Sequence, residues 1–144
     1  MGPGYAYERN GRPYSVEEVL QHVYPDRPWD TWRWHEFDGD RIDMRSRRYR
    51  LFKLKGTVCV TCGLKGAYFV KERSRSAAGQ MAERFHFNLY GLNQNGVETI
   101  MTLDHIVSRH NGGRDILENS QPMCGPCNWR KDNGAPELSP QEVR

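Results

Sequence analysis

Two cysteine pairs of the form C-x-x-C lie far apart in this chain of 144 residues and constrain its fold more than any other feature. The pairs are Cys59–Cys62 and Cys124–Cys127, and the sequence contains no other cysteine. Four thiolates at this spacing match the tetrahedral all-cysteine site that structural zinc prefers. We therefore expect a structural Zn²⁺ that joins two distant segments. A redox dithiol is the alternative reading of a C-x-x-C pair.

Length and charge narrow the class of protein. A chain of this length suits one compact domain with a short appended module. No apolar run approaches the roughly 20 residues that a transmembrane helix needs, and the N-terminus lacks the pattern of a secretion signal. We expect a cytoplasmic protein with no membrane partner. In the cytoplasm thiols stay reduced and are available to bind metal. The net charge of +3 is a mild bias toward a polyanionic partner.

The first 55 residues are expected to form an N-terminal extension with short helices and aromatic side chains. Residues 1–14 show no periodicity and predict an irregular arm. Residues 15–25 begin with a capping box and continue with apolar residues at helical spacing, which predicts a short amphipathic helix. Residues 25–43 hold three tryptophans among prolines and aspartates and predict a loop anchored by buried aromatic side chains. Stacking on DNA is the alternative use of these rings.

Residues 41–55 form the most basic stretch of the chain and contain a single acid, Asp43. Apolar residues interleave with the cations, which predicts a helix with its apolar side on the core and its cations outside. An ordinary solvated face would show the same pattern. Beside a metal site, such a cluster is typical of contact with a phosphate backbone. The residues that we expect to bind nucleic acid here are Arg45, Arg47, Arg48, Arg50 and Lys53.

Three segments after the first cysteine pair predict strands, at residues 67–71, 84–90 and 97–103. Phe85, Phe87 and Leu89 alternate with polar residues in the second segment, and the sequence Asn-Gln-Asn-Gly between the last two predicts a turn. A long β-hairpin should therefore lead into Asp104. Residues 136–144 begin with a proline and are expected to form a peripheral tail.

The second half of the chain carries a compound motif. The pair Asp104-His105 is followed by two glycines, by a Leu-Glu-Asn step that ends at Asn119, and by the helix start C-x-x-C-N-x-x-K, which contains Asn128. Together with the upstream C-x-x-C pair, this motif resembles the HNH nuclease family over roughly residues 56–133.

The resemblance implies an α+β fold with a ββα-metal, treble-clef-like core. The nuclease domain would span residues 56–135, with the four-cysteine zinc site as its scaffold and an inserted β-hairpin between the two cysteine pairs. Small free-standing members of the family are commonly carried by phages or mobile elements. The expected partner is therefore DNA, in double-stranded form.

The residue types in the motif suit phosphodiester hydrolysis. This reaction needs an activated water and a cation beside the phosphate, and His105 can act as the general base near neutral pH. Asp104 and Asn128 offer oxygen ligands for the catalytic ion. Many family members carry a histidine where this chain has Asn128, so Mg²⁺ or Mn²⁺ fits better than catalytic Zn²⁺. By resemblance, Asn119 positions the loop that carries His105 through backbone hydrogen bonds.

The helix that begins at the second cysteine pair also carries cations. Arg130 and Lys131 lie in its first turns, where they could contact the phosphate, and a solvated face is the alternative. Because adjacent strand residues point to opposite faces, we also expect regular pairing to end near Asp104, so that His105 can line the same site.

The sequence therefore predicts a metal-dependent HNH endonuclease that hydrolyses DNA. A non-catalytic zinc module that binds nucleic acid is the alternative function. That alternative accounts for the cysteines but leaves the register of Asp104, His105, Asn119 and Asn128 unexplained.

Overall fold

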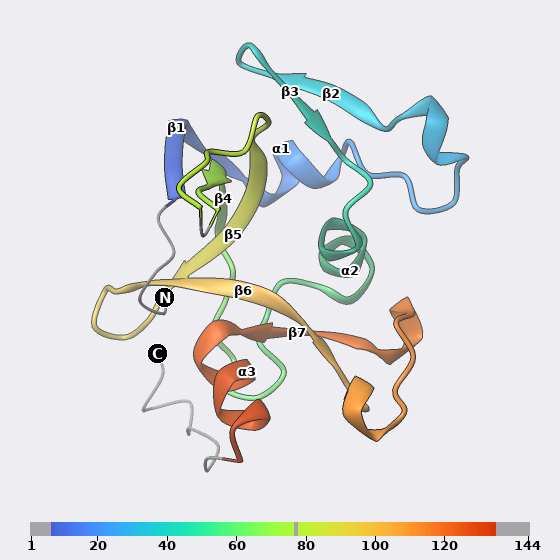
Figure 1. Ribbon diagram of the computed structural model, residues 1–144, viewed down its shortest axis with the longest axis vertical. Helices are drawn as coiled ribbons and strands as arrows, with labels where there is room; N and C mark the ends of the chain where they lie inside the picture. The colour runs from blue at the N-terminus through green and yellow to red at the C-terminus, as the bar shows by residue number, and fades with distance from the viewer. Residues whose placement is uncertain (1–6, 77, 135–144) are drawn as a thin grey trace.

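An antiparallel sheet of five strands, in the order β1-β4-β5-β6-β7, organises the computed structural model of the chain (Figure 1). The structure describes residues 7–76 and 78–134. A separate two-stranded hairpin, β2-β3, lies beyond one end of the sheet. Three α-helices complete the mixed α/β fold in the described residues. No helix in that part of the chain is long and apolar enough to cross a membrane.

The first 55 residues contain β1 (Tyr7–Ser15), α1 (Val16–Leu20), the 3-10 turn η1 (Trp29–Thr31), β2 (Trp34–Phe37), β3 (Asp40–Asp43) and α2 (Arg47–Lys55). The rest of the chain contains β4 (Tyr68–Ser74), β5 (His86–Leu92), β6 (Glu98–His105), the 3-10 turns η2 (Arg109–Asn111) and η3 (Leu117–Asn119), β7 (Ser120–Cys124) and α3 (Gly125–Asp132). The three strands that the sequence predicts between residues 67 and 103 are present as β4, β5 and β6.

The core is built on one face of the central strands, where side chains alternate with period two. Phe87 and Leu89 of β5 are fully buried in it. The Phe87 ring meets Tyr14 of β1 and Phe37 of β2 edge to face, with centroids 5.4 and 4.8 Å apart. One cluster of buried side chains thus contains residues both from the first 55 positions, which were expected to form an extension, and from the rest of the chain.

The N-terminal segment is a strand over residues 7–15, so the prediction of an irregular arm is wrong there; residues 1–6 lie outside the described residues. An ion pair between Arg9 and the buried Glu72, at 3.0 Å, helps to hold β1 against β4. The two residues are far apart in the sequence, so no local pattern predicts this contact. Only Tyr14 is buried in β1, so the strand has no apolar alternation. The capping box at Ser15 is confirmed as the start of α1.

The basic segment is a strand followed by a helix, which corrects the prediction of a single helix over residues 41–55. Its first residues form β3, paired with β2, and the helix α2 begins only at Arg47, where the Ser46 side chain caps it. The prediction of buried tryptophans is also wrong for Trp29, which is 52% exposed. Aromatic rings in this region lie against arginine side chains, as in the stack of Arg45 on Trp29 at 4.7 Å.

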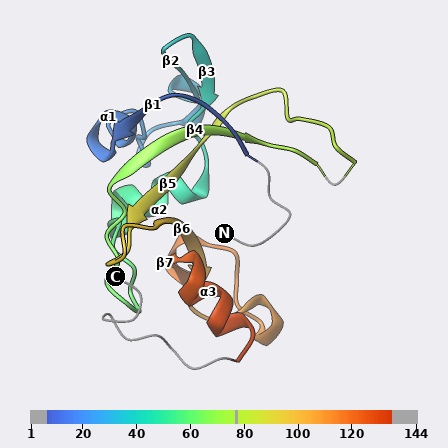
Figure 2. The same ribbon diagram turned by 90° about the vertical axis from the view of Figure 1, so that its left-hand side faces the viewer.

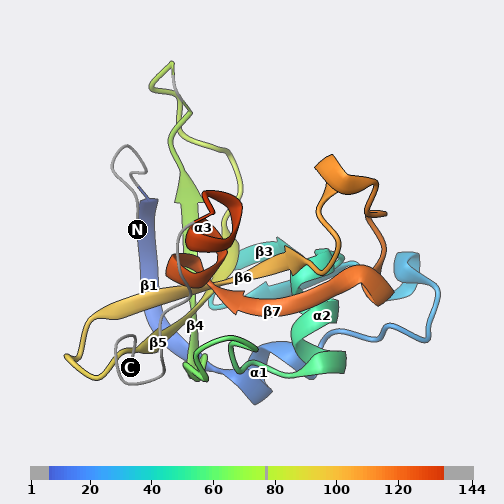
Figure 3. The same cartoon turned by 90° about the horizontal axis from the view of Figure 1, so that it is seen from below.

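The strands β6 and β7 form an antiparallel pair that carries α3 on one side and α2 on the other, as Figures 1 and 3 show. The chain between the two strands, residues 106–119, projects from one end of this pair and contains η2 and η3 (Figure 3). Figure 2 shows α3 seated below the sheet, close to the strands that precede it. This arrangement brings the end of β6 and the start of α3 together.

Candidate active site and metal centre

The four cysteines meet in one buried cluster in which all four Sγ atoms lie within 4.8 Å of one another. Cys124 ends β7, and Cys127 lies in the first turn of α3. The loop with the first pair is attached to β7 by a hydrogen bond from Val60 N to Pro122 O of 3.0 Å. In a tetrahedral site with Zn–S bonds of about 2.3 Å, the sulfurs would be about 3.8 Å apart. The observed distance from Cys62 Sγ to Cys124 Sγ is 3.7 Å, which fits zinc.

The protonation of the thiols supports the same conclusion. A hydrogen bond from Cys124 lowers the pKa of Cys59 to about 4, and the same contact raises that of Cys124. Burial raises the pKa of Cys127 to about 12. Without a cation, a second thiolate this close is unfavourable because like charges repel. A divalent cation bound by all four sulfurs removes that repulsion, so the donor set suits a structural zinc.

Asp104 is a buried carboxylate, only 4% exposed, near the end of β6. Its Oδ2 accepts hydrogen bonds from Gln121 Nε2 at 2.9 Å and from Lys131 Nζ at 2.7 Å. The lysine also donates to the His105 carbonyl at 2.8 Å. Lys131 thus points into the centre and neutralises Asp104, whereas we expected it to reach an external phosphate.

His105 is the last residue of β6, and its pairing with Ser120 shows that regular pairing continues one residue past Asp104. The ring remains partly exposed, and its Nε2 lies 2.8 Å from Asp115 Oδ1. The Asp115 carboxylate also pairs with Arg47 of α2 and with Arg109. The Arg47 guanidinium, together with the His105 hydrogen bond, lowers the pKa of Asp115 to about 2.

Asp115 is the side chain that sequence reasoning missed. It lies two residues after Gly113, and no local pattern marks it as part of the motif. Arg47, which the sequence assigned to nucleic-acid binding, forms an ion pair with Asp115 from α2, an element far away in the sequence. The structure therefore connects the basic helix to His105 through one acid.

Asn119 ties the two ends of the 106–119 loop together with three hydrogen bonds. Its Oδ1 accepts from Val107 N at 2.8 Å, and its Nδ2 donates to Val107 O at 2.9 Å and to Arg114 O at 2.8 Å. The loop passes so close to itself that a Cβ on Gly113 would stand 1.7 Å from Val107 O. Only glycine fits that position without movement of the backbone.

Asn128 lies in α3 directly after the last cysteine, and its Nδ2 donates to Thr102 Oγ1 at 2.9 Å. Thr102 and Asp104 alternate onto the same face of β6, so the amide and the carboxylate approach each other across the strand and the helix. Asn128, Asp104 and His105 line one cavity of about 180 Å³. Asp132 also lines this cavity. An ion held by the Asp104 carboxylate and the Asn128 amide oxygen would complete its shell with water and substrate oxygens. In the described residues, only the cysteines form a cluster of three or more metal-ligating Cys, His, Asp or Glu side chains.

The basic residues predicted to bind nucleic acid have different surroundings. Arg45 forms a two-pronged ion pair with Asp43. Arg48 donates to the amide of Asn88. Lys53 points inward and donates to the carbonyls of Leu20 and Val23, so it serves the contact between α1 and α2. Arg130 of α3 is half-buried and Arg50 lines a separate cavity.

Comparison with known families identifies part of the chain. Residues 91–134 match the model of the HNH endonuclease family. No curated protein and no solved structure is similar enough to the chain to match. The matched segment runs from the end of β5 through α3 and contains Asp104, His105, Asn119 and Asn128. It also contains the second cysteine pair, while the first pair lies upstream. Residues 91–134 are therefore similar to the HNH endonuclease family, and the four-cysteine cluster is consistent with a zinc site.

Proposed function

We propose that this protein is a metal-dependent endonuclease that hydrolyses phosphodiester bonds in DNA, with His105 as the general base. One observation carries the proposal: an imidazole, a buried carboxylate and an amide line one cavity of about 180 Å³ inside the segment that matches the HNH family. The elements around it, β6, β7 and α3, correspond to a ββα-metal core.

His105 receives the proton of the attacking water in this mechanism. Its Nε2 donates to Asp115, which leaves Nδ1 to accept that proton. The carboxylate of Asp115 holds the ring in this orientation and stabilises the positive charge that forms on it. Asp115 is therefore a positioning residue that acts through His105. The side-chain hydrogen bonds of Asn119 hold the loop that contains Asp115.

Asp104 and Asn128 would hold the catalytic Mg²⁺ or Mn²⁺ through a carboxylate and an amide oxygen. Bound there, the ion would supply positive charge to the scissile phosphate and the departing 3′ oxygen. Thr102 orients the Asn128 amide, and Gln121 orients the Asp104 carboxylate. Lys131 competes for the same carboxylate oxygen and neutralises it before the ion binds. Arg109 also lines the cavity and could contact the phosphate.

A nicking assay tests the proposal. Purified protein is incubated with supercoiled plasmid and Mg²⁺ or Mn²⁺, beside His105→Ala and the control His110→Ala, a second exposed histidine of the same loop. Removal of a general base typically lowers the rate by about 10²–10⁴-fold, so His105→Ala should nick at least about a hundredfold more slowly. His110→Ala should nick like the wild type. A zinc module that only binds nucleic acid would leave the plasmid intact in every sample, and an equally active His105→Ala would exclude His105 as the base.

A further inference from the structure

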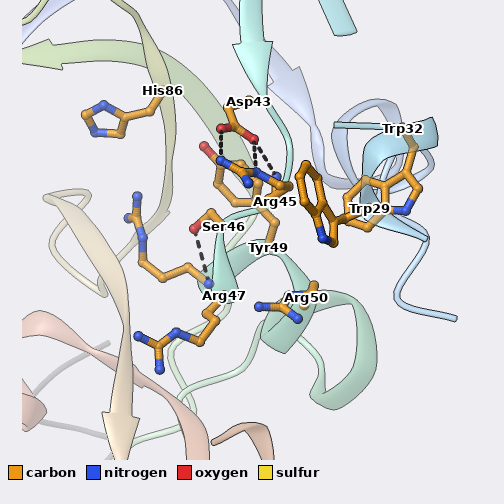
Figure 4. Close-up of a pocket in the computed structure, with 10 residues that line it drawn as sticks. Trp29, Trp32, Asp43, Arg45, Ser46, Arg47, Tyr49, Arg50 and His86 are labelled. Carbon is orange, nitrogen blue, oxygen red and sulfur yellow. Dashed lines mark hydrogen bonds and ion pairs between the residues drawn. The ribbon is translucent and has the colours of Figure 1, made fainter. Parts of the chain in front are cut away.

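A second and larger cavity, of about 620 Å³, lies between the η1 turn and the first turns of α2 (Figure 4). Cavities of about 300–1,000 Å³ are typical of small-ligand sites. Its walls combine aromatic rings with guanidinium groups and one carboxylate. The lining residues are Trp29, Trp32, Asp43, Arg45, Ser46, Arg47, Arg48, Tyr49, Arg50 and His86.

The cavity carries uncompensated positive charge. Its single carboxylate, Asp43, is already engaged by Arg45 and by Arg33. Arg48 donates to neutral amide and carbonyl oxygens. The Nε atom of Arg50 is buried without a hydrogen-bond partner in the described residues. In that part of the chain neither Arg48 nor Arg50 forms an ion pair with an acid. Two guanidinium groups without a counter-charge on one cavity suit an anionic ligand.

An exposed tryptophan stands at the same cavity. Trp29 is 52% exposed, and the Arg45 guanidinium lies 4.7 Å from its ring centre. Figure 4 draws Trp29 and Arg45 together with Arg50 among the residues that line the cavity. Because Asp43 holds Arg45 in place, this contact also fixes the ring. A fixed aromatic ring beside arginines is the usual platform for a nucleobase in proteins that bind single strands. Paired bases in a duplex are stacked on one another and offer no free face to such a ring.

The cavity adjoins the proposed catalytic centre through one side chain. Arg47 lines it and pairs with Asp115, and Asp115 contacts His105. A strand whose phosphate lies at His105 would therefore have a neighbouring nucleotide within reach of the cavity. We infer that this cavity binds one nucleotide of the substrate strand with its base unpaired, the base on Trp29 and its phosphate on Arg48 and Arg50. This inference rests on the proposed function for its substrate but concerns a separate site.

Fluorescence anisotropy with two labelled DNA duplexes tests the inference. One duplex is fully paired and the other carries a single unpaired nucleotide, and binding is measured without added divalent metal. Wild type should bind the second duplex at least about fivefold more tightly, since stacking of one base on an aromatic ring typically gives that much or more. Trp29→Ala and Arg50→Gln should each abolish this preference. Trp129→Ala, which removes a 60% exposed tryptophan outside the cavity, should retain it.

Equal affinity of the wild type for the two duplexes would overturn the inference, and so would an unchanged preference in both Trp29→Ala and Arg50→Gln. The cavity would then be a contact for the phosphates of paired DNA. The outcome is separable from that of the nicking assay. If His105 is not catalytic, His105→Ala nicks normally while the binding preference persists. If only the nucleotide site is wrong, His105→Ala still fails to nick.

Discussion

The side chain of Asn119 makes three hydrogen bonds that all end on the loop after His105, so its removal isolates the effect of loop position. Each such bond contributes about 0.5–1.5 kcal/mol net, and partial exposure places these near the lower end. Together they hold the loop closed by about 2 kcal/mol, which corresponds to about a thirtyfold change in its open population. Without these bonds the open and closed loops would be about equally populated, so we expect Asn119→Ala to lower the nicking rate at saturating DNA by about twofold. DNA affinity and zinc content should not change.

Asn119→Asp is the matched control for the chemistry of the amide. It keeps an acceptor for Val107 N but replaces both donors with a charged oxygen that faces the carbonyls of Val107 and Arg114. It should therefore lose at least as much activity as Asn119→Ala. Single-turnover nicking of supercoiled plasmid measures the rate. Hydrogen exchange at the Ile106 amide, which donates to the backbone carbonyl of Asn119 at 2.8 Å and not to its side chain, measures loop opening. The reasoning fails if the Ile106 amide stays as protected in Asn119→Ala as in the wild type.

Three further changes test the remaining parts of the centre. Asp115→Asn keeps the size of the side chain but removes its charge, so the nicking rate at saturating DNA should fall at least about tenfold with little change in DNA binding; an unchanged rate would contradict its positioning role. Lys131→Met leaves the buried Asp104 carboxylate without its cation and should destabilise the protein by about 2 kcal/mol; Mn²⁺ should then raise the melting temperature more than in wild type, and equal shifts would show that Lys131 does not compete with the ion. Elemental analysis should find about one zinc per chain, which Cys62→Ser lowers together with folding, and a folded zinc-free protein would exclude the structural site.

The fold could be predicted from the sequence where a local signal coincides with burial. In β5 the buried Phe87 and Leu89 alternate with His86 and Asn88, and α1 has its capping box. The strand β1 could not be found in this way, because its only buried residue is Tyr14 and its pairing uses the distant Glu72. The strand β3 was not predicted for a related reason, since its one arginine and its aspartates give no apolar alternation.

In the candidate site, too, the residues of a local motif could be predicted from the sequence and the contacts between distant residues could not. The motif supplied the chemical types at Asp104, His105, Asn119 and Asn128, and the fold brings three of them to one cavity. The contacts of Asp115 with Arg47 and of Lys131 with Asp104 join residues that are 68 and 27 positions apart. Spacing in the sequence carries no information about such pairs. They arise only because β6 and β7 place α2 and α3 on their two sides.

The metal cluster and the catalytic cavity share the same short helix, so the zinc should control the geometry of the cavity. The helix α3 spans Gly125–Asp132, and eight residues are too few to form a stable helix alone. Its first turn is fixed by Cys124 and Cys127, and Asn128 follows directly. Polar contacts that also reach β6 are the hydrogen bond of Asn128 to Thr102 and the bonds of Lys131 to Asp104 and to the His105 carbonyl. A divalent ion at Asp104 would compete with the ion pair of Lys131, so a zinc on the cysteines would then carry a larger share of the anchoring of α3.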